Sequence, residues 1–273
     1  MRRITAGELS KILKEHKRWI DTDEKEGEKA DLSGAGLSDA DLFCANLTNA
    51  NLRGADLSDA NLFKANLRGA NLKEADLYYA DLSGADLFRA DLSGASLERA
   101  TLERASLSGA DLIDASLERA TLERASLSGA SLECADLSSA DLSSAILIGA
   151  ILSEANMSEA GLSGADLRGA NLKEADLSNA DLTEANLSEA NLSEADLTCA
   201  RLRYANLSEA DLSEADLSGA NLTKVKNLSI NELSKEKTLY KAKLDPELME
   251  QVEDKYPHLL KEEEDEDDEE DEE

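Results

Sequence analysis

The chain has 273 residues, with 29 Lys and Arg against 59 Asp and Glu, and its formal net charge is −30. This excess of acid excludes simple electrostatic binding to nucleic acid or anionic lipid, because both require a surplus of Lys and Arg. Aromatic residues make up 3% of the chain, too few for a base-stacking surface, and no apolar run approaches the roughly 20 residues that span a bilayer.

Residues 1–29 are predicted to form an N-terminal helical cap. Thr5 followed by Glu8 is a capping-box signature. Apolar residues and one His then recur at helical spacing over about residues 6–20, namely Leu9, Ile12, Leu13, His16, Trp19 and Ile20. His16 has no ligand partner nearby in sequence, so a His packed beside the core is expected rather than a metal ligand. The segment lacks the apolar region of a signal peptide, and with three Cys in the chain we expect a reducing cytoplasm.

A five-residue repeat occupies residues 30–224. Ala stands at position 30 and at every fifth position through 220, and Leu follows two residues later in each unit, with Met157 the one substitute. The residue before the Leu is Asp in 16 of the 39 units and Asn in 11. On an α-helix successive Leu would be rotated by about 140°, and on a flat strand they would alternate between faces. The chain must therefore turn a corner in each unit, so that every Leu and Ala points into one interior.

Duplications within the repeat favour a coil of four units with a square cross-section. Residues 96–110 and 116–130 are identical, and the sequence LRGANLKEADL occurs at 67–77 and again at 167–177, so both offsets are multiples of 20. The 39 units then make 39/4 = 9.75 coils, and at about 4.8 Å per coil the rod is about 47 Å long. Representative core residues are Leu32, Leu82, Leu142, Met157 and Leu222.

The A-(D/N)-L-x-x unit resembles the pentapeptide repeat family over residues 30–224. The resemblance implies an all-β solenoid, a right-handed quadrilateral β-helix, in which Leu and the preceding Ala fill the interior and the other three positions face outward. The flanking segments resemble end segments found with bacterial members of the family. Some members dimerise end to end, so the resemblance allows either a monomer or an end-to-end dimer.

Residues 225–261 are predicted to form a C-terminal helical cap, with a short helix or turn within 228–240. Asp245 is a good N-cap and Pro246 a good first residue for a second helix, with Leu248, Met249, Val252 and Tyr256 as its apolar stripe. A dimer contact is the alternative role of this segment. Residues 262–273 are all acidic, which predicts a disordered, solubilising tail; binding of something basic is the alternative.

The sequence contains no catalytic constellation, no cofactor-binding motif and no metal-ligand spacing. The only two His, His16 and His258, lie near opposite ends of the chain. Cys44, Cys134 and Cys199 fall on three different sides of the coil, too far apart for a disulfide. The Asp and Asn before each Leu form a row of oxygens, for which a structural role at the corners is favoured over calcium binding.

Charge is distributed unequally over the four sides of the coil. We name them the first side (Leu32, Leu52 and onward), the second (Leu37 and onward), the third (Leu42 and onward) and the fourth (Leu47 and onward). The first side carries 11 acids and 3 bases, and the second carries 11 acids and 2 bases, so their net charges are −8 and −9. The third side carries 7 acids and 6 bases, and the fourth carries 4 acids and 3 bases, so each has a net charge of −1. One acidic column on the first side comprises Glu154, Glu174, Glu194 and Glu214, and one on the second comprises Asp176, Asp196 and Asp216.

An apolar break and a group of aromatics also occupy outward positions. Ile146, Ile148 and Ile151 stand where nearby units have Ser, Asp or Asn, which indicates either a partner contact or drift at a tolerant position. Phe43 and Phe63 share a column near the N-terminal end, with Tyr78, Tyr79 and Phe88 close by. Stacking that stiffens the first coils is the favoured role, and a binding patch is the alternative.

The sequence therefore predicts a non-enzymatic bacterial rod that acts as a protein-interaction or structural module. Its protein partner is unidentified, and a basic protein is one candidate. The candidate interaction surface comprises the two acidic columns and the three Ile residues. The alternative is a DNA-mimicking modulator of a DNA-binding enzyme such as gyrase, because the resemblance includes members that imitate DNA against gyrase. Direct binding to nucleic acid or membrane is not expected.

Overall fold

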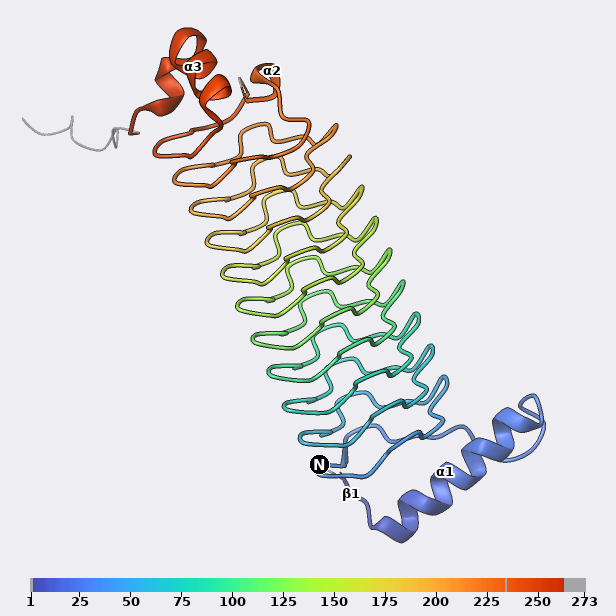
Figure 1. Ribbon diagram of the computed structural model, residues 1–273. Helices are drawn as coiled ribbons and strands as arrows, with labels where there is room; N and C mark the ends of the chain where they lie inside the picture. Colours follow the sequence, from blue (N-terminus) through green and yellow to red (C-terminus); the bar gives the residue numbers. More distant parts are fainter. Residues whose placement is uncertain (1, 234, 263–273) are drawn as a thin grey trace, which may run out of the picture.

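The repeat coils into a straight-sided rod whose successive turns pair as parallel strands (Figure 1). The computed structural model describes residues 2–233 and 235–262, so the predicted acidic tail lies outside the described residues apart from residue 262. Residues that precede a Leu form parallel bridges with residues 20 positions further along, from Asp31 with Asn51 to Asn206 with Lys226. One coil therefore takes four units, as the duplications predicted, and the rod is a right-handed quadrilateral β-helix.

The interior of the rod contains the Leu and Ala side chains. Every Leu of the repeat, together with Met157, is at most 3% exposed, and Leu32, Leu82, Leu142 and Leu222 are among these buried residues. Full burial of a Leu contributes roughly 2 kcal/mol. Because each coil adds four Leu, the stability of the rod grows with each coil, as expected of a solenoid in which a coil contacts only its neighbours.

Backbone hydrogen bonds follow the same pattern in each unit. Leu52 N–H donates to Asn71 C=O of the next coil at 2.7 Å, and Ala55 N–H closes a β-turn on Leu52 C=O at 3.0 Å. The last residue of all 39 units has a φ between +52° and +67°, in the left-handed region. Gly adopts this region freely and other residues at a cost of roughly 1–2 kcal/mol. Gly54, which ends its unit, also donates its N–H to Lys73 C=O at 2.9 Å, a ladder bond that helps offset this cost.

The N-terminal cap consists of strand β1 (Arg2–Arg3) and helix α1 (Ala6–Asp21). β1 pairs in parallel with β2 (Ala35–Gly36), so it extends the ladder beyond the first coil on the second side. The capping box of Thr5 and Glu8 is present. Leu9, Ile12 and Leu13 of α1 pack against the end of the core, and Figure 1 shows the helix lying across this end of the rod.

His16 is the one fully buried side chain of α1. Its Nδ1 accepts the N–H of Ala30 at 3.1 Å, so the sequence was right to place it beside the core. Burial lowers the pKa of the imidazole, as does the nearby Lys29 to a smaller extent. His16 is therefore a neutral residue that anchors the cap to the first unit of the repeat.

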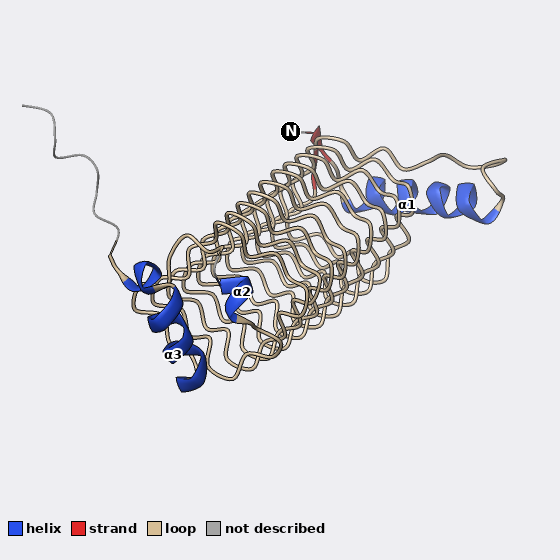
Figure 2. Ribbon diagram, turned by 90° about the horizontal axis from the view of Figure 1, so that it is seen from above, coloured by secondary structure: helices blue, strands red, loops and turns tan. Residues whose placement is uncertain are grey.

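The C-terminal end holds three short helices, α2 (Ile230–Leu233), α3 (Pro246–Lys255) and the 3-10 helix η1 (Pro257–Leu260). Figure 2 shows these helices and α1 at opposite ends of the rod. Leu248, Met249, Val252 and Tyr256 belong to the same apolar cluster as the core. The expected helical caps at both ends are thus present.

The ladder of parallel bridges extends beyond the five-residue repeat, which ends at residue 224. Thr238 pairs with Asp216 and Lys243 with Asn221, each at an offset of 22 rather than 20. Two extra residues around α2 therefore interrupt the five-residue period. The segment 225–261, which was expected to be a helical cap, also contributes part of another coil. Asp245 occupies the N-cap position of α3 without a side-chain capping bond; its carboxylate accepts the N–H of Lys224 instead.

Candidate interaction surface

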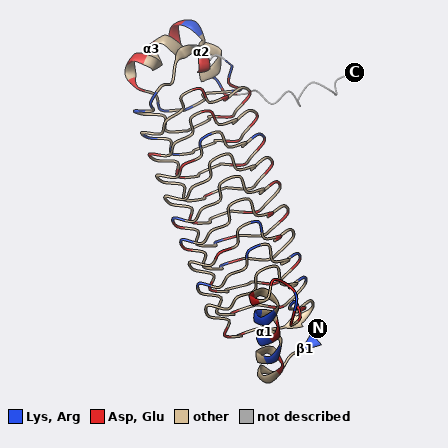
Figure 3. Ribbon diagram, turned by 90° about the vertical axis from the view of Figure 1, so that its right-hand side faces the viewer, with Lys and Arg blue, Asp and Glu red and all other residues tan. Residues whose placement is uncertain are grey.

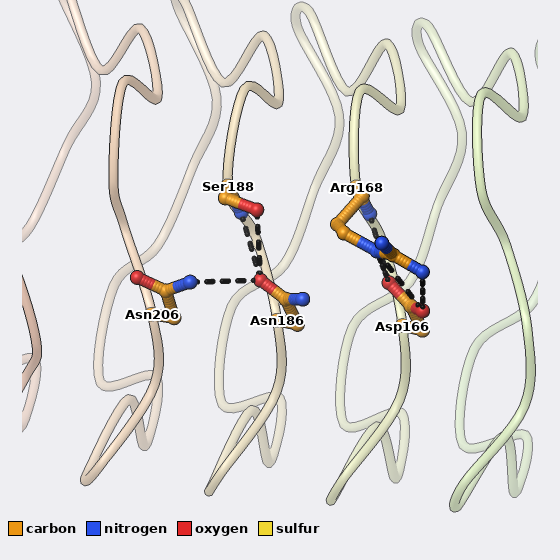
Figure 4. A network of polar contacts seen from close by, with 5 residues as sticks. All are labelled: Asp166, Arg168, Asn186, Ser188 and Asn206. Carbon is orange, nitrogen blue, oxygen red and sulfur yellow. Dashed lines mark hydrogen bonds and ion pairs between the residues drawn. The ribbon is translucent and has the colours of Figure 1, made fainter.

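The side chain before each Leu completes the hydrogen bonding of the backbone. In all 27 units with Asp or Asn at this position, its Oδ1 accepts the N–H of the residue two positions later, at 2.8–3.4 Å. Figure 4 shows this bond from Ser188 to Asn186. Such local bonds are typical of Asp and Asn in turns. The Asp and Asn rows therefore have the structural role that the sequence favoured.

Asn adds a second bond, between coils. Asn206 Nδ2 donates to Asn186 Oδ1 at 3.0 Å (Figure 4), and Asn51 donates to Asp31 in the same way. A carboxylate cannot donate such a bond, so an Asn above an Asp or Asn links coils that two stacked Asp residues would push apart. Among residues 2–233 and 235–262, no group of His, Cys, Asp and Glu is arranged to hold a metal ion.

The predicted glutamate column lies at the last position of four units on the first side. Glu154, Glu174, Glu194 and Glu214 all have a positive φ of 58–61° and are exposed. Lys173 interrupts the column, because its Nζ lies 2.8 Å from the Glu174 carboxylate and 3.3 Å from that of Glu194. Two of the four carboxylates of this column are therefore partly neutralised by Lys173.

The predicted aspartate column lies before the Leu in three units on the second side. Asp176 bridges Asp196, and Asp196 bridges Asp216, in successive coils. One oxygen of each accepts a backbone N–H at 2.8 Å. These residues therefore combine the structural role with a surface charge, and of the three Asp196 is the most exposed.

The three Ile residues form an exposed apolar patch. Ile146, Ile148 and Ile151 are 40%, 37% and 42% exposed, which is unusual for Ile. Ile146 bridges Ser126 in the preceding coil and Ile151 bridges Ser131, so small polar side chains lie on one flank of the patch. The three side chains point outward, and their role as a partner contact stays a prediction.

Aromatic residues stack near the N-terminal end. Phe43 and Phe63 lie parallel, with ring centroids 5.9 Å apart, as their shared column predicted. The guanidinium groups of Arg68 and Arg89 lie 4.4 and 5.0 Å from the Phe88 ring, within the range of cation–π attraction. These Arg contacts could not be predicted from the repeat pattern, since they depend on side-chain direction.

The three Cys residues are exposed and form no disulfide. Cys134 Sγ lies 4.0 Å from the Glu154 carboxylate. Desolvation, together with the nearby carboxylates of Glu154 and Asp114, raises the pKa of the Cys134 thiol. A thiol that stays protonated is a poor nucleophile, so Cys134 has no sign of a reactive role.

Sequence reasoning missed a buried carboxyl group at the C-terminal end. Glu236 is 6% exposed, and neither carboxyl oxygen has a hydrogen-bond partner among the described residues. Burial, reinforced by the nearby charge of Asp211, raises its pKa to about 9. No periodic signal could have found it, because it lies where the five-residue count is interrupted.

Charged residues are distributed along the whole length of the rod, as the coloured ribbon of Figure 3 shows. Ion pairs between coils join Arg53 to Glu74 at 3.2 Å and Arg68 to Asp86 at 3.2 Å. These exposed pairs contribute little to stability, but they reduce the local charge. None of the described helices is long and apolar enough to cross a membrane.

Comparison with known proteins identifies the same five-residue repeat and the same fold. A profile of the family described as pentapeptide repeats matches eight overlapping segments that together run from residue 28 to residue 226. The crystal structure of HetL, a pentapeptide repeat protein involved in heterocyst differentiation regulation in the cyanobacterium Nostoc, has 38% sequence identity and a TM-score of 0.67. The match covers 80% of this chain and 96% of HetL.

Two further solved structures are similar over smaller parts or less closely. A pentapeptide repeat protein of the Arabidopsis thaliana thylakoid lumen has 33% identity and a TM-score of 0.30, and the match covers 36% of this chain and 72% of that one. QnrB1, a plasmid-mediated fluoroquinolone resistance protein, has 19% identity and a TM-score of 0.35, covering 78% and 96%. A search of curated protein sequences found no significant match.

Proposed function

Because the chain belongs to the pentapeptide repeat family, we propose that it is a non-enzymatic rod in the bacterial cytoplasm that binds a partner protein through its first and second sides. The observation that carries this proposal is the charge distribution. These two adjacent sides hold −8 and −9, or −17 of the −19 in the repeat. The negative electrostatic field is therefore concentrated over two adjacent sides, and such a field attracts a basic protein surface toward them.

The construction of the rod supports an interaction role. The interior is filled by Ala and Leu, and the Asp or Asn before the Leu bonds to the backbone in 27 of the 39 units. The last two residues of each unit face outward and do not fill the core, although the last one must adopt a positive φ. A partner could therefore be recognised through the outward residues without loss of the fold. HetL, the similar structure from Nostoc, is involved in regulating heterocyst differentiation, and a regulatory role for this chain is compatible with an interaction rod.

Imitation of DNA is the second candidate, and the density of acidic columns favours it. Duplex DNA carries about one charge per 1.7 Å, or about 28 over 47 Å, and the repeat carries −19 over a similar length. Two features oppose it: Lys173 partly neutralises the glutamate column, and one oxygen of each Asp in the aspartate column is engaged by the backbone.

Replacing one acidic column tests the proposal. The variant carries Gln at Glu154, Glu174, Glu194 and Glu214, and a matched control carries Gln at Arg104, Arg124, Arg201 and Arg203 on the third side. Each rod is immobilised, and the proteins retained from a bacterial lysate are quantified by mass spectrometry. We expect a protein that the wild type and the control retain and that the Glu variant loses. Equal losses on the variant and the control would contradict recognition through the acidic sides.

Purified gyrase distinguishes the two candidates. If the rod imitates DNA, adding it to a supercoiling reaction changes the rate, and the Glu variant changes it less than the control does. If the rod acts on another partner, supercoiling is unaffected at concentrations that saturate binding of the retained protein.

A further inference from the structure

The fourth side has an uncharged centre, unlike the rest of this acidic molecule. Its units at 105–109, 125–129 and 145–149 contain no charged residue in three successive coils. Ile146 and Ile148 project from the last of these units and are 40% and 37% exposed. Ser126 and Ser128 occupy the same two positions in the preceding coil. The centre of this side is therefore a raised apolar step beside a low shelf of small residues.

The two ends of the same side carry opposite charges. Toward the N-terminus lie Arg68 and Arg89. The one acidic residue in their two units is Asp86, whose carboxylate lies 3.2 Å from the Arg68 guanidinium. Toward the C-terminus lie Glu189 and Glu209, both exposed, with no basic residue in their two units. Between the neutral centre and Glu189, Arg168 is held by Asp166 at 2.7 Å, so that unit is neutral as a pair (Figure 4).

We propose that the fourth side is the contact surface for a second copy of this chain, which packs against it with the rod direction reversed. The two-fold axis lies in the contact plane, across the rods, between the coils of Ser128 and Ile148. Unit 145–149 then faces unit 125–129 of the other copy, and unit 85–89 faces unit 185–189. A contact of this kind is isologous, so each pairing occurs twice.

This register makes the surface complementary to itself. Ile148 meets the Ser128 shelf of the other copy, and the equivalent contact is made by symmetry. Arg89 faces Glu189, and Arg68 lies beside Glu209. The neutral pair of Asp166 and Arg168 faces the uncharged unit 105–109. Apolar, neutral and charged segments are thus each matched along about eight coils, or about 38 Å of the rod at the usual spacing.

Other arrangements of two copies are less favourable. With the rods parallel, Arg89 would face Arg89 and Glu189 would face Glu189, which places like charges together. Contact through the first or second side would oppose net charges of −8 or −9. Contact through the fourth side directs the second side, which lies opposite it, away from the other copy. The first side meets the fourth at a corner and faces sideways, at right angles to the contact, so it is not covered by it.

The size of the surface predicts a weak dimer. A side of about three extended residues is about 10 Å wide, so eight coils present about 400 Å² on each copy, below the roughly 800 Å² per partner of a standard stable interface. The net charge of −30 on each copy also opposes association, although at about 0.15 M salt it is screened beyond about 8 Å. Association is therefore expected only at high protein concentration.

Sedimentation equilibrium up to about 1 mM protein at constant salt tests the surface. We expect a monomer–dimer equilibrium for the full chain that Ile148→Glu weakens at least tenfold and Ile148→Ser weakens less. Ser138→Glu, at the corresponding position on the opposite second side, should leave it unchanged. Circular dichroism confirms that each variant is folded. A monomer throughout the range, or equal effects of Ile148→Glu and Ser138→Glu, would overturn the proposal.

A charge exchange and a cross-link test the register. Arg89→Glu and Glu189→Arg should each weaken the dimer, and the double variant should restore it. In a background with Ser at Cys44, Cys134 and Cys199, a mixture of Arg89→Cys protein and Glu189→Cys protein should give a disulfide-linked heterodimer. Arg89→Cys protein alone should give none. A cross-link with Arg89→Cys alone, or no rescue by the double variant, would contradict the antiparallel register.

Discussion

At the scale of single residues, one backbone N–H explains why Asp and Asn stand before the Leu. It belongs to the residue directly after the Leu. The other backbone N–H groups of a unit donate within the β-turn or to adjacent coils. The N–H of this residue has no such acceptor, and the side chain two positions earlier supplies one. Asn and Asp can both accept, so the position tolerates a neutral or a charged residue. That freedom allows acid to accumulate on two sides without loss of the fold.

Asn186→Ala should destabilise the rod by about 1–3 kcal/mol, because it removes three partly buried hydrogen bonds and each typically contributes about 0.5–1.5 kcal/mol. The change removes the bonds that Asn186 accepts from the Ser188 N–H and hydroxyl and from Asn206. The matched control is Thr121→Ala, at a position before a Leu whose side chain makes no hydrogen bond within the described chain. Thermal melts that fall equally for both variants would show that the Asn bonds contribute nothing specific.

Leu142→Asp should be far more damaging than Ser143→Asp, although the two positions are adjacent. Leu142 is fully buried, so the first change places an unpaired charge in an apolar interior at a cost of several kcal/mol. Ser143 faces outward, where most substitutions stay within about 0.5 kcal/mol. The measurement is the melting temperature of each variant, and similar values would mean that Leu does not point inward.

At the scale of elements, the two ends differ in how well the sequence predicted them. Helix α1 could be placed because its capping box and apolar spacing are local signals, and local signals survive in the structure. The C-terminal end was predicted less completely. Its two extra residues shift Thr238 out of the five-residue register, so counting could not show that the ladder resumes. The burial of Glu236 depends on that interruption and was equally invisible.

Glu236→Gln should stabilise the C-terminal end at neutral pH and leave it nearly unchanged at acid pH. The folded pKa of Glu236 is raised to about 9 from an ordinary 4.5, so the unfolded chain releases the proton first as pH rises. The wild-type end therefore loses stability progressively between about pH 4.5 and 9. Gln cannot ionise, so the variant should not show this loss.

Hydrogen exchange of the amides in residues 235–260 at several pH values measures this effect locally. The wild type should exchange faster as pH rises, beyond the intrinsic increase in chemical exchange, and Glu236→Gln should follow the intrinsic rate alone. The reverse ordering, with the Gln variant exchanging faster at pH 7, would mean that the carboxylate is charged and stabilising.

At the scale of the whole molecule, a strict period of five determines the shape of the rod. The period predicted the inward Leu, and the duplications predicted the coil of four units, because both follow from geometry that every unit shares. The pairing of individual surface charges could not be predicted in this way. Lys173 lies between Glu174 and Glu194 because of the directions its side chain takes, which the repeat does not specify. The sequence therefore predicted the column in which a residue stands, but not the side chain with which it forms an ion pair.

Both proposals for the surface depend on columns of residues 20 positions apart, and an engineered disulfide tests those columns most directly. With Ser at Cys44 and Cys199, Glu154→Cys places a thiol one coil above Cys134, where two Cα atoms about 4.8 Å apart suit a disulfide. Gly149→Cys and Glu159→Cys, at offsets of 15 and 25, are the controls on neighbouring sides. After mild oxidation, mass spectrometry should find a disulfide within one chain only for the Cys134 and Glu154→Cys pair. A disulfide formed as readily by either control would contradict the coil of four units, and with it the acidic columns and the neutral fourth side.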